Sequence, residues 1–170
     1  MSGRSIRGVS LSELTLVDSP GLAESAGIIL MAADVVGFDT ESKPIFRKGE
    51  ISDGPHLVQL AVEQQVYLFP VWCAATHGLL KRVLESPAII KAGFGLGNDR
   101  SALRVRLGIE LNNTVDLGEK LRGPGHRGTV GAKVAVAHFF WRKADQVKEV
   151  GDQQLGQQAL GRAPDVICSQ

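Results

Sequence analysis

The apolar positions of the chain fall into short blocks that predict alternating strands and helices. Short apolar runs bounded by polar and glycine residues are typical of strands, and longer segments with apolar residues three or four apart are typical of helices. Strands are expected at residues 35–38, 56–62, 66–71, 88–92 and 114–116, and helices at residues 20–33, 76–84, 98–107 and 129–140. Three strands followed by alternating helices and strands predict an α/β fold with a mixed β-sheet.

Two local signals support these assignments. Pro20 stands at the first position of the first predicted helix, after Ser19 as a possible N-cap. The link Gln64-Gln65 is short enough for a hairpin, so the strands on either side of it are expected to be antiparallel.

Composition describes a soluble globular protein of ordinary charge. The longest apolar stretch, residues 26–33, is too short to cross a bilayer, and the polar N-terminus lacks a secretory signal, so no membrane partner and a cytoplasmic location are expected. Cys73 and Cys168 are too few for a disulfide framework or a zinc site. A net charge of +1 means that nucleic-acid binding would depend on local basic patches and metal ions.

Two carboxylates stand at the end of the first predicted strand. Asp39 and Glu41 are separated by one residue, and positions i and i+2 of a strand face the same side. Adjacent anions repel each other unless a cation lies between them, and a divalent ion held by oxygen ligands is the usual solution. The pair therefore predicts a metal site, with a solvated strand end as the alternative.

A glycine-rich turn follows the strand at residues 88–92. Asp99, near the start of the next helix, is either a functional carboxylate or only a helix cap. Gly93, Gly95 and Gly97 also suggest a dinucleotide-binding loop, but that fingerprint requires glycine or alanine at the place of Asn98 and normally opens a domain. A nucleotide cofactor is therefore disfavoured.

Taken together, these segments resemble the DEDD superfamily of 3'-5' exonucleases, in the branch that includes RNase D and the Werner-type exonuclease domain. FDTESKPIFRKGE is similar to the first motif of that family, KAGFGLGNDRSAL to the second, and TVDL followed by GTVGAKVAVAHFF to the approach to the third. The resemblance runs from about Asp34 to Phe140. It implies a ribonuclease-H-like mixed sheet, with three antiparallel strands and then parallel strands, flanked by helices.

The resemblance also implies the chemistry of the site. Asp39, Glu41 and Asp99 would be catalytic ligands of two Mg²⁺ or Mn²⁺ ions, which activate water and stabilise the leaving 3' oxygen. The substrate would be a single-stranded 3' end of DNA or RNA. The implied nucleic-acid contacts are Lys43, Arg47, Lys48, Phe94 and Asn98, although a solvated loop is an equally open explanation of the three basic residues. Asp116 matches no catalytic ligand and is expected to be a cap or a supporting group.

The third motif of the family, a Tyr four residues before a final Asp, is absent. The best in-frame candidate runs from Gly161, at the Tyr position, to Asp165, and Pro164 would disrupt its helix. Loss of both groups is expected to reduce or abolish activity, so a non-catalytic nucleic-acid-binding module is the alternative function. Residues 1–140 are expected to form the exonuclease-like domain, and residues 141–170 an atypical tail of the same domain.

Our hypothesis for this tail is a one-base slip near residues 139–141. Residues Ile167-Cys-Ser-Gln170 with a stop codon can be back-translated so that the next frame reads Tyr-Ala-Ala-Asn, as the third motif requires. Sequencing of the gene is expected to show codons that permit this reading. Codons for residues 167–170 that do not permit it would exclude the hypothesis.

Overall fold

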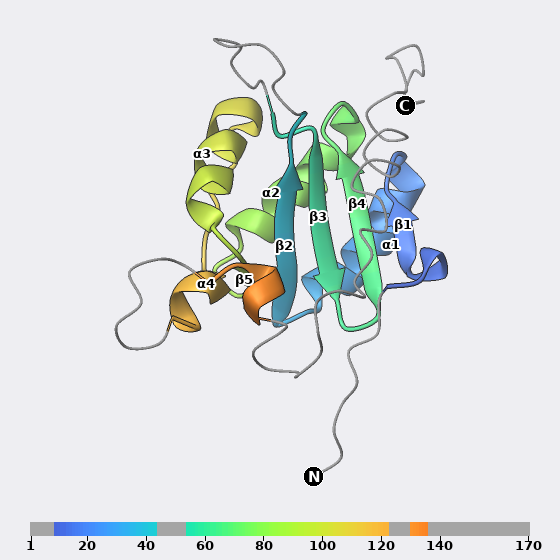
Figure 1. The fold of residues 1–170 in the computed structure, drawn as a ribbon. Coiled ribbons are helices and arrows are strands. Elements are labelled where there is room, and N and C mark those ends of the chain that lie inside the picture. The colour runs from blue at the N-terminus through green and yellow to red at the C-terminus, as the bar shows by residue number, and fades with distance from the viewer. Residues whose placement is uncertain (1–8, 44–53, 123–129, 136–170) are drawn as a thin grey trace.

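The structure is a computed structural model that describes residues 9–43, 54–122 and 130–135. In this part of the chain, six strands form one sheet in the order β1-β4-β3-β2-β5-β6 (Figure 1). The strands are β1 (Leu14–Leu16), β2 (Val35–Glu41), β3 (Leu57–Val62), β4 (Gln65–Pro70), β5 (Ile90–Gly93) and β6 (Thr114–Asp116). The α-helices are α1 (Pro20–Met31), α2 (His77–Glu85), α3 (Leu96–Leu107) and α4 (Leu117–Lys120), and 3₁₀ turns cover Leu11–Glu13 and Ala74–Thr76.

The predicted sheet topology is confirmed. Strands β2, β3 and β4 are antiparallel neighbours, and β5 and β6 run parallel to β2. The hairpin turn lies one residue earlier than predicted, because Val62 pairs with Gln65. Of the helix predicted for residues 129–140, residues 132–135 are helical, and residues 129 and 136–140 lie outside the described ranges.

Two short elements of the structure were not predicted from the sequence pattern. β1 has three residues and pairs in parallel with the outer side of β4, and α4 has four residues directly after β6. Neither segment is long enough to display a period of two or of 3.6, so tertiary pairing decides its structure.

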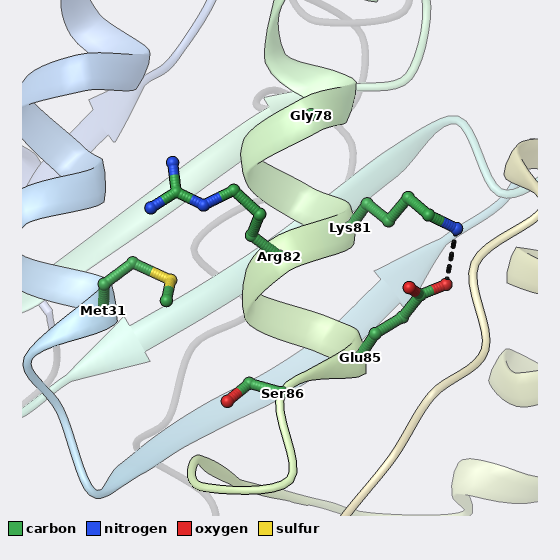
Figure 2. A pocket seen from close by; sticks show the side chains of 6 residues that line it. All are labelled: Met31, Gly78, Lys81, Arg82, Glu85 and Ser86. Carbon is green, nitrogen blue, oxygen red and sulfur yellow. Dashed lines mark hydrogen bonds and ion pairs between the residues drawn. The ribbon is translucent and has the colours of Figure 1, made fainter.

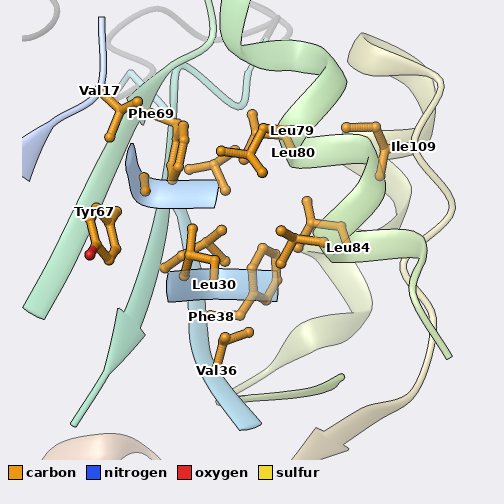
Figure 3. Packing of buried hydrophobic residues seen from close by; sticks show 14 of the residues in the cluster. Val17, Leu30, Val36, Phe38, Tyr67, Phe69, Leu79, Leu80, Leu84 and Ile109 are labelled. Atoms are coloured by element: carbon orange, nitrogen blue, oxygen red, sulfur yellow. The ribbon is translucent and has the colours of Figure 1, made fainter. Parts of the chain in front are cut away.

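A hydrophobic core fills the space between one face of the sheet and the helices α1, α2 and α3. Figure 1 shows α1 and α2 behind the central strands, and Figure 3 shows the side chains that meet there. The core includes Val36, Phe38, Leu60 and Phe69 from the strands and Leu30, Leu80, Leu84 and Leu103 from the helices. Burial of each such side chain stabilises the fold by about 1.5–3 kcal/mol.

Lys91 in β5 is a buried cation within this otherwise apolar layer. Its side chain has no solvent exposure, and its Nζ donates hydrogen bonds to the carbonyl oxygens of Ser86 and Ile89, each at 2.7 Å. Burial lowers the pKa of Lys91 to about 8, because the ammonium ion loses its hydration. The two carbonyl contacts engage two of its three donors without neutralising its charge.

The lowered pKa of Lys91 predicts a specific dependence of stability on pH. Between about pH 8 and the ordinary pKa of 10.5, the unfolded chain holds a proton that the folded chain releases. The unfolding free energy of the wild type is therefore expected to rise across this range relative to that of Lys91→Met. Urea denaturation of both proteins at pH 7, 8, 9 and 10 measures the difference, and a difference that stays constant with pH contradicts the prediction.

Candidate active site

The candidate site lies at the carboxyl end of β2, the strand between β3 and β5. Asp39 pairs with Gln59 of β3, and Glu41 pairs with Leu57. Asp39 is exposed and Glu41 is half-buried, whereas Val36 and Phe38 are buried in the core. Because side chains alternate along a strand, Asp39 and Glu41 share the face of the sheet that is directed away from the core.

Two glycines bring the start of α3 to this end of β2. A Cβ atom at Gly93 would lie 2.4 Å from the carbonyl oxygen of Phe38 and 2.6 Å from Cδ2 of Leu96, so a side chain does not fit there. Gly95 precedes α3 with a φ of 71°, in the left-handed region that favours glycine. The glycine-rich turn thus has a structural reason, namely the close approach of β5 and α3 to β2.

Asp99 lies in the first turn of α3 and is held by a residue of the first motif. Its Oδ1 accepts a hydrogen bond from the hydroxyl of Thr40. The amide of Thr40 in turn donates to Oδ1 of Asp39, at 2.9 Å. Thr40 therefore contacts two of the three predicted carboxylates, Asp39 and Asp99, a role that its position in the sequence did not reveal.

The three predicted ligands thus share one end of β2 without forming one cluster. Thr40 faces the side of β2 opposite to Asp39 and Glu41, and Asp99 is bonded to Thr40. Within the described ranges, no three His, Cys, Asp or Glu side chains lie close enough to hold a metal ion together. Carboxylate oxygens suit Mg²⁺ and Mn²⁺, so the donor chemistry fits such an ion, and the site shared by all three residues stays a prediction.

His56 fixes the chain beside Glu41. Its amide donates to the carbonyl oxygen of Glu41 at 2.8 Å, and its Nδ1 accepts from the amide of Lys43 at 3.2 Å. His56 therefore has a structural role at the end of β2. Lys43 is exposed directly after β2, at the candidate site.

The other predicted nucleic-acid contacts are only partly described. Phe94 is half-buried and Asn98 is exposed, and both flank the start of α3. Arg47 and Lys48 lie outside the described residues. These contacts stay predictions.

Asp116 is a cap, as expected, and it serves two helices. Its Oδ1 accepts hydrogen bonds from the amides of Gly118 and Glu119 at the start of α4, and its Oδ2 accepts from the amide of Leu96 at the start of α3. Partial burial raises the pKa of Asp116, but hydrogen bonds from the amides of Leu96, Gly95, Glu119 and Gly118 outweigh this effect, and the pKa is lowered.

Arg100 provides a second connection between α3 and β6. Its guanidinium donates to the carbonyl oxygen of Leu111 and to the hydroxyl of Thr114, each at 2.9 Å. Together with Asp116, this arginine holds the helix that carries Asp99 against the strand next to it. Arg100 is thus engaged in the fold, although it directly follows a predicted ligand.

A depression of about 400 Å³ lies on the helical side of the molecule (Figure 2). Its lining residues are Met31, Gly78, Lys81, Arg82, Glu85 and Ser86. None of them is a predicted site residue, and Met31 and Ser86 are close in sequence to the amino ends of β2 and β5, opposite to Asp39 and Glu41. The depression is therefore separate from the candidate site.

The mixed sheet flanked by helices is a ribonuclease-H-like fold, and comparison with known proteins identifies the same kind of domain. A family described as 3'-5' exonuclease matches residues 16–158. The chain is 35% identical over 102 residues to the bifunctional 3'-5' exonuclease/ATP-dependent helicase WRN of Mus musculus. The matched segment covers 59% of this chain and 7% of that protein. It is 29% identical over 155 residues to the exonuclease mut-7 homolog of Homo sapiens, covering 85% of this chain and 17% of that protein.

Solved structures show the same fold. RNase D of Trypanosoma brucei in complex with RNA U12 has a TM-score of 0.69 at 18% identity, over 86% of this chain and 57% of that one. The EXO domain of Aedes aegypti Nibbler has a TM-score of 0.65 at 22% identity, over 92% of this chain and 83% of that one.

The chain belongs to the 3'-5' exonuclease domain family, as the sequence motifs indicated. It spans less than a fifth of the length of the two curated relatives, of which it covers 7% and 17%. Among the described helices, none has the length and apolar character needed to span a membrane.

Asp116→Ala is expected to destabilise the fold by about 1–2 kcal/mol, because the amides at the starts of α3 and α4 lose their acceptor. The lowered pKa of Asp116 means that its ionised form stabilises the fold above its ordinary pKa of 3.8 and that this contribution is lost as the pH falls below that value. Urea denaturation at pH 7 and pH 3 measures both effects.

Glu119→Ala is the matched control for this substitution. It removes a carboxylate from the same turn and leaves the Asp116 acceptors in place. Equal losses of stability in the two variants at pH 7 would show that Asp116 contributes only charge and not the caps.

Proposed function

We propose that this chain is a 3'-5' exonuclease domain for hydrolysis of phosphodiester bonds at the 3' end of a single-stranded nucleic acid, with activity impaired by the missing third motif. The family match supports the class of reaction. The observation that carries the proposal is the placement of Asp39 and Glu41 side by side at the end of β2, on the face directed away from the core, next to the helix of Asp99.

Divalent ions fit this proposal through the donor chemistry of the carboxylates. Asp39 and Glu41 would hold an Mg²⁺ or Mn²⁺ ion, which would supply a Lewis acid for activation of water and stabilisation of the leaving oxygen. Asp99 would join these ligands only if its hydrogen bond with Thr40 were broken. We therefore assign the two-metal mechanism to an intact member of the family, and one weakly held ion or none to this chain.

The missing third motif is the reason for expecting impairment. Neither a Tyr nor a helix-compatible Asp is available at residues 161–165, a segment that lies outside the described residues. Without that Tyr the attacking water would lack an orienting group, and without the Asp the ion beside it would lose a ligand. Both defects act on the transition state and therefore lower the rate of cleavage.

The substrate proposed is a 3' end of DNA or RNA. A structural relative was solved with RNA, and a sequence relative is a 3'-5' exonuclease joined to a helicase. Lys43 is exposed beside Glu41, where a backbone phosphate would gain a cation. Contacts with the phosphate backbone would dominate such binding. We also propose a cytoplasmic location, and the proposal includes neither a membrane partner nor a nucleotide cofactor.

A non-catalytic nucleic-acid-binding module is the second candidate function. Two observations favour it: the sequence lacks the third motif, and Asp99 is bonded to Thr40 and not gathered with Asp39 and Glu41. Such a module would keep the phosphate contacts and the fold, and it would bind a 3' end without cutting it.

Binding of Mn²⁺ and cleavage, measured separately, test the proposal. The chain is expected to bind Mn²⁺ weakly, in the millimolar range typical of incomplete carboxylate sites, and Asp39→Asn is expected to weaken this binding at least about tenfold by removing a charged ligand. Electron paramagnetic resonance titration measures the free Mn²⁺. A 5'-labelled single strand incubated with Mn²⁺ is expected to give only slow shortening from its 3' end.

Asp34→Asn is the matched control, because Asp34 is an exposed carboxylate that directly precedes the opposite end of the same strand. Equal Mn²⁺ binding by both variants would exclude the ion site. Binding of the labelled nucleic acid without cleavage, in the wild type and in both variants, would favour the non-catalytic module. Cleavage at internal positions that persists in Asp39→Asn would contradict the exonuclease.

A further inference from the structure

Hydrogen bonds on both flanks of α3 fix how this helix is turned about its own axis. Leu103 is fully buried and marks the face that α3 directs into the core. On one flank of that face, the carboxylate of Asp99 accepts a hydrogen bond from the hydroxyl of Thr40 in β2. On the other flank, the guanidinium of Arg100 donates to the hydroxyl of Thr114 in β6 at 2.9 Å. The remaining side chains of α3 can therefore be assigned to the β2 side or to the β6 side from their spacing along the helix.

This spacing places Arg106 on the β2 side of α3, together with Asp99. Arg106 follows Asp99 by seven residues, which is about 20° short of two full turns and a rise of about 10 Å along the helix. The two side chains therefore share one flank of α3. Arg106 is exposed, and its guanidinium forms no ion pair or hydrogen bond within the described ranges.

Arg104, in the same helical turn, is the counterpart on the other flank. It stands two residues before Arg106 and hence about 160° away around the helix. Its Nε pairs with the carboxylate of Glu110, between α3 and β6, at 3.3 Å. Both arginines lie in the last turn of α3, where a cation interacts favourably with the helix dipole. The dipole accounts equally for both residues, so it does not explain why Arg106 stands on the side of Asp99 without a carboxylate partner.

Helix α3 carries Arg106 past the carboxyl end of β2. β5 pairs with Val35–Gly37 at the start of β2, whereas Asp99 of α3 contacts Thr40 near the end of the strand. Contacts with β2 thus advance toward its carboxyl end as the chain proceeds from β5 into α3, and Figure 1 shows α3 rising along this end of β2. Arg106 is two turns further on, at the end of the molecule where Lys43 is exposed after β2.

We propose that Arg106 binds a backbone phosphate of the nucleic-acid strand whose 3' end lies at Asp39 and Glu41. This inference rests on the proposed function and adds to it a binding residue outside the sequence motifs. A guanidinium can donate two parallel hydrogen bonds to one phosphate, and here no carboxylate of the described structure competes for it. The rise of about 10 Å from Asp99 to Arg106 favours a phosphate upstream of the scissile one.

Fluorescence anisotropy with a 5'-labelled oligothymidylate tests this contact, in a buffer without divalent ions so that no cleavage occurs. In the full 170-residue chain, Arg106→Gln is expected to raise the dissociation constant about fivefold at low salt. The same variant is expected to reduce the slope of log K against log salt concentration by about 0.7, because one phosphate fewer is neutralised. Arg106→Lys keeps the charge and is expected to stay within about threefold of the wild type.

Arg104→Gln is the matched control, because it removes the same charge from the same turn on the β6 side. It is expected to change the dissociation constant by less than about twofold. Urea denaturation is expected to give similar stabilities for Arg104→Gln and Arg106→Gln, since both arginines are exposed.

The outcomes separate this inference from the proposed function. A wild type that binds the strand and an Arg106→Gln variant that binds it equally well would overturn the contact and leave the proposed function intact. Equal weakening by Arg104→Gln would also overturn it, since net charge alone would then explain the effect. A wild type that does not bind the strand would overturn the proposed substrate together with the inference. Because binding and not cleavage is measured, the test applies equally to a catalytic domain and to a non-catalytic module.

Discussion

Successive side chains of β2 face opposite sides of the sheet, and the two faces of this one strand separate stability from chemistry. Val36 and Phe38 are buried with α1 and α2 and hold the strand in the middle of the sheet. Asp39, which is exposed, and Glu41, which is half-buried, face the other side. A shift of one residue in the pairing of β2 with β3 would place the carboxylates in the core and the apolar residues in solvent. The hydrophobic effect therefore fixes where the carboxylates lie.

The second part of the candidate site depends on how firmly α3 is held against β2. Gly93 permits the close approach of backbones, Asp116 accepts the amide of Leu96, and Arg100 ties the helix to Leu111 and Thr114. These contacts bring Asp99 within reach of Thr40. None of these supporting residues needs to touch a substrate, yet each constrains the position of a predicted ligand. The glycine-rich turn thus has a structural role in this close approach.

The sequence predicted the fold well because the central strands and helices are long enough for their apolar patterns to identify them. The hairpin strands and the helix that follows Gly95 lie within one or two residues of their predicted bounds, and the strand at Val35 begins as predicted but ends three residues later, at Glu41. β1 and α4 were missed because pairing with β4 and capping by Asp116 determine them. The motifs identified Asp39, Glu41 and Asp99, but the hydrogen bond of Asp99 with Thr40 depends on packing of α3 that no spacing reveals. The burial of Lys91 was likewise invisible in the pattern.

The central claim is that carboxylates at the end of β2 form the ion-binding centre of an exonuclease domain. Anomalous diffraction from crystals soaked in Mn²⁺ tests it most directly. The account predicts a manganese peak between the carboxylates of Asp39 and Glu41, with Asp99 turned toward it from Thr40. A manganese peak that lies remote from β2 would contradict the account.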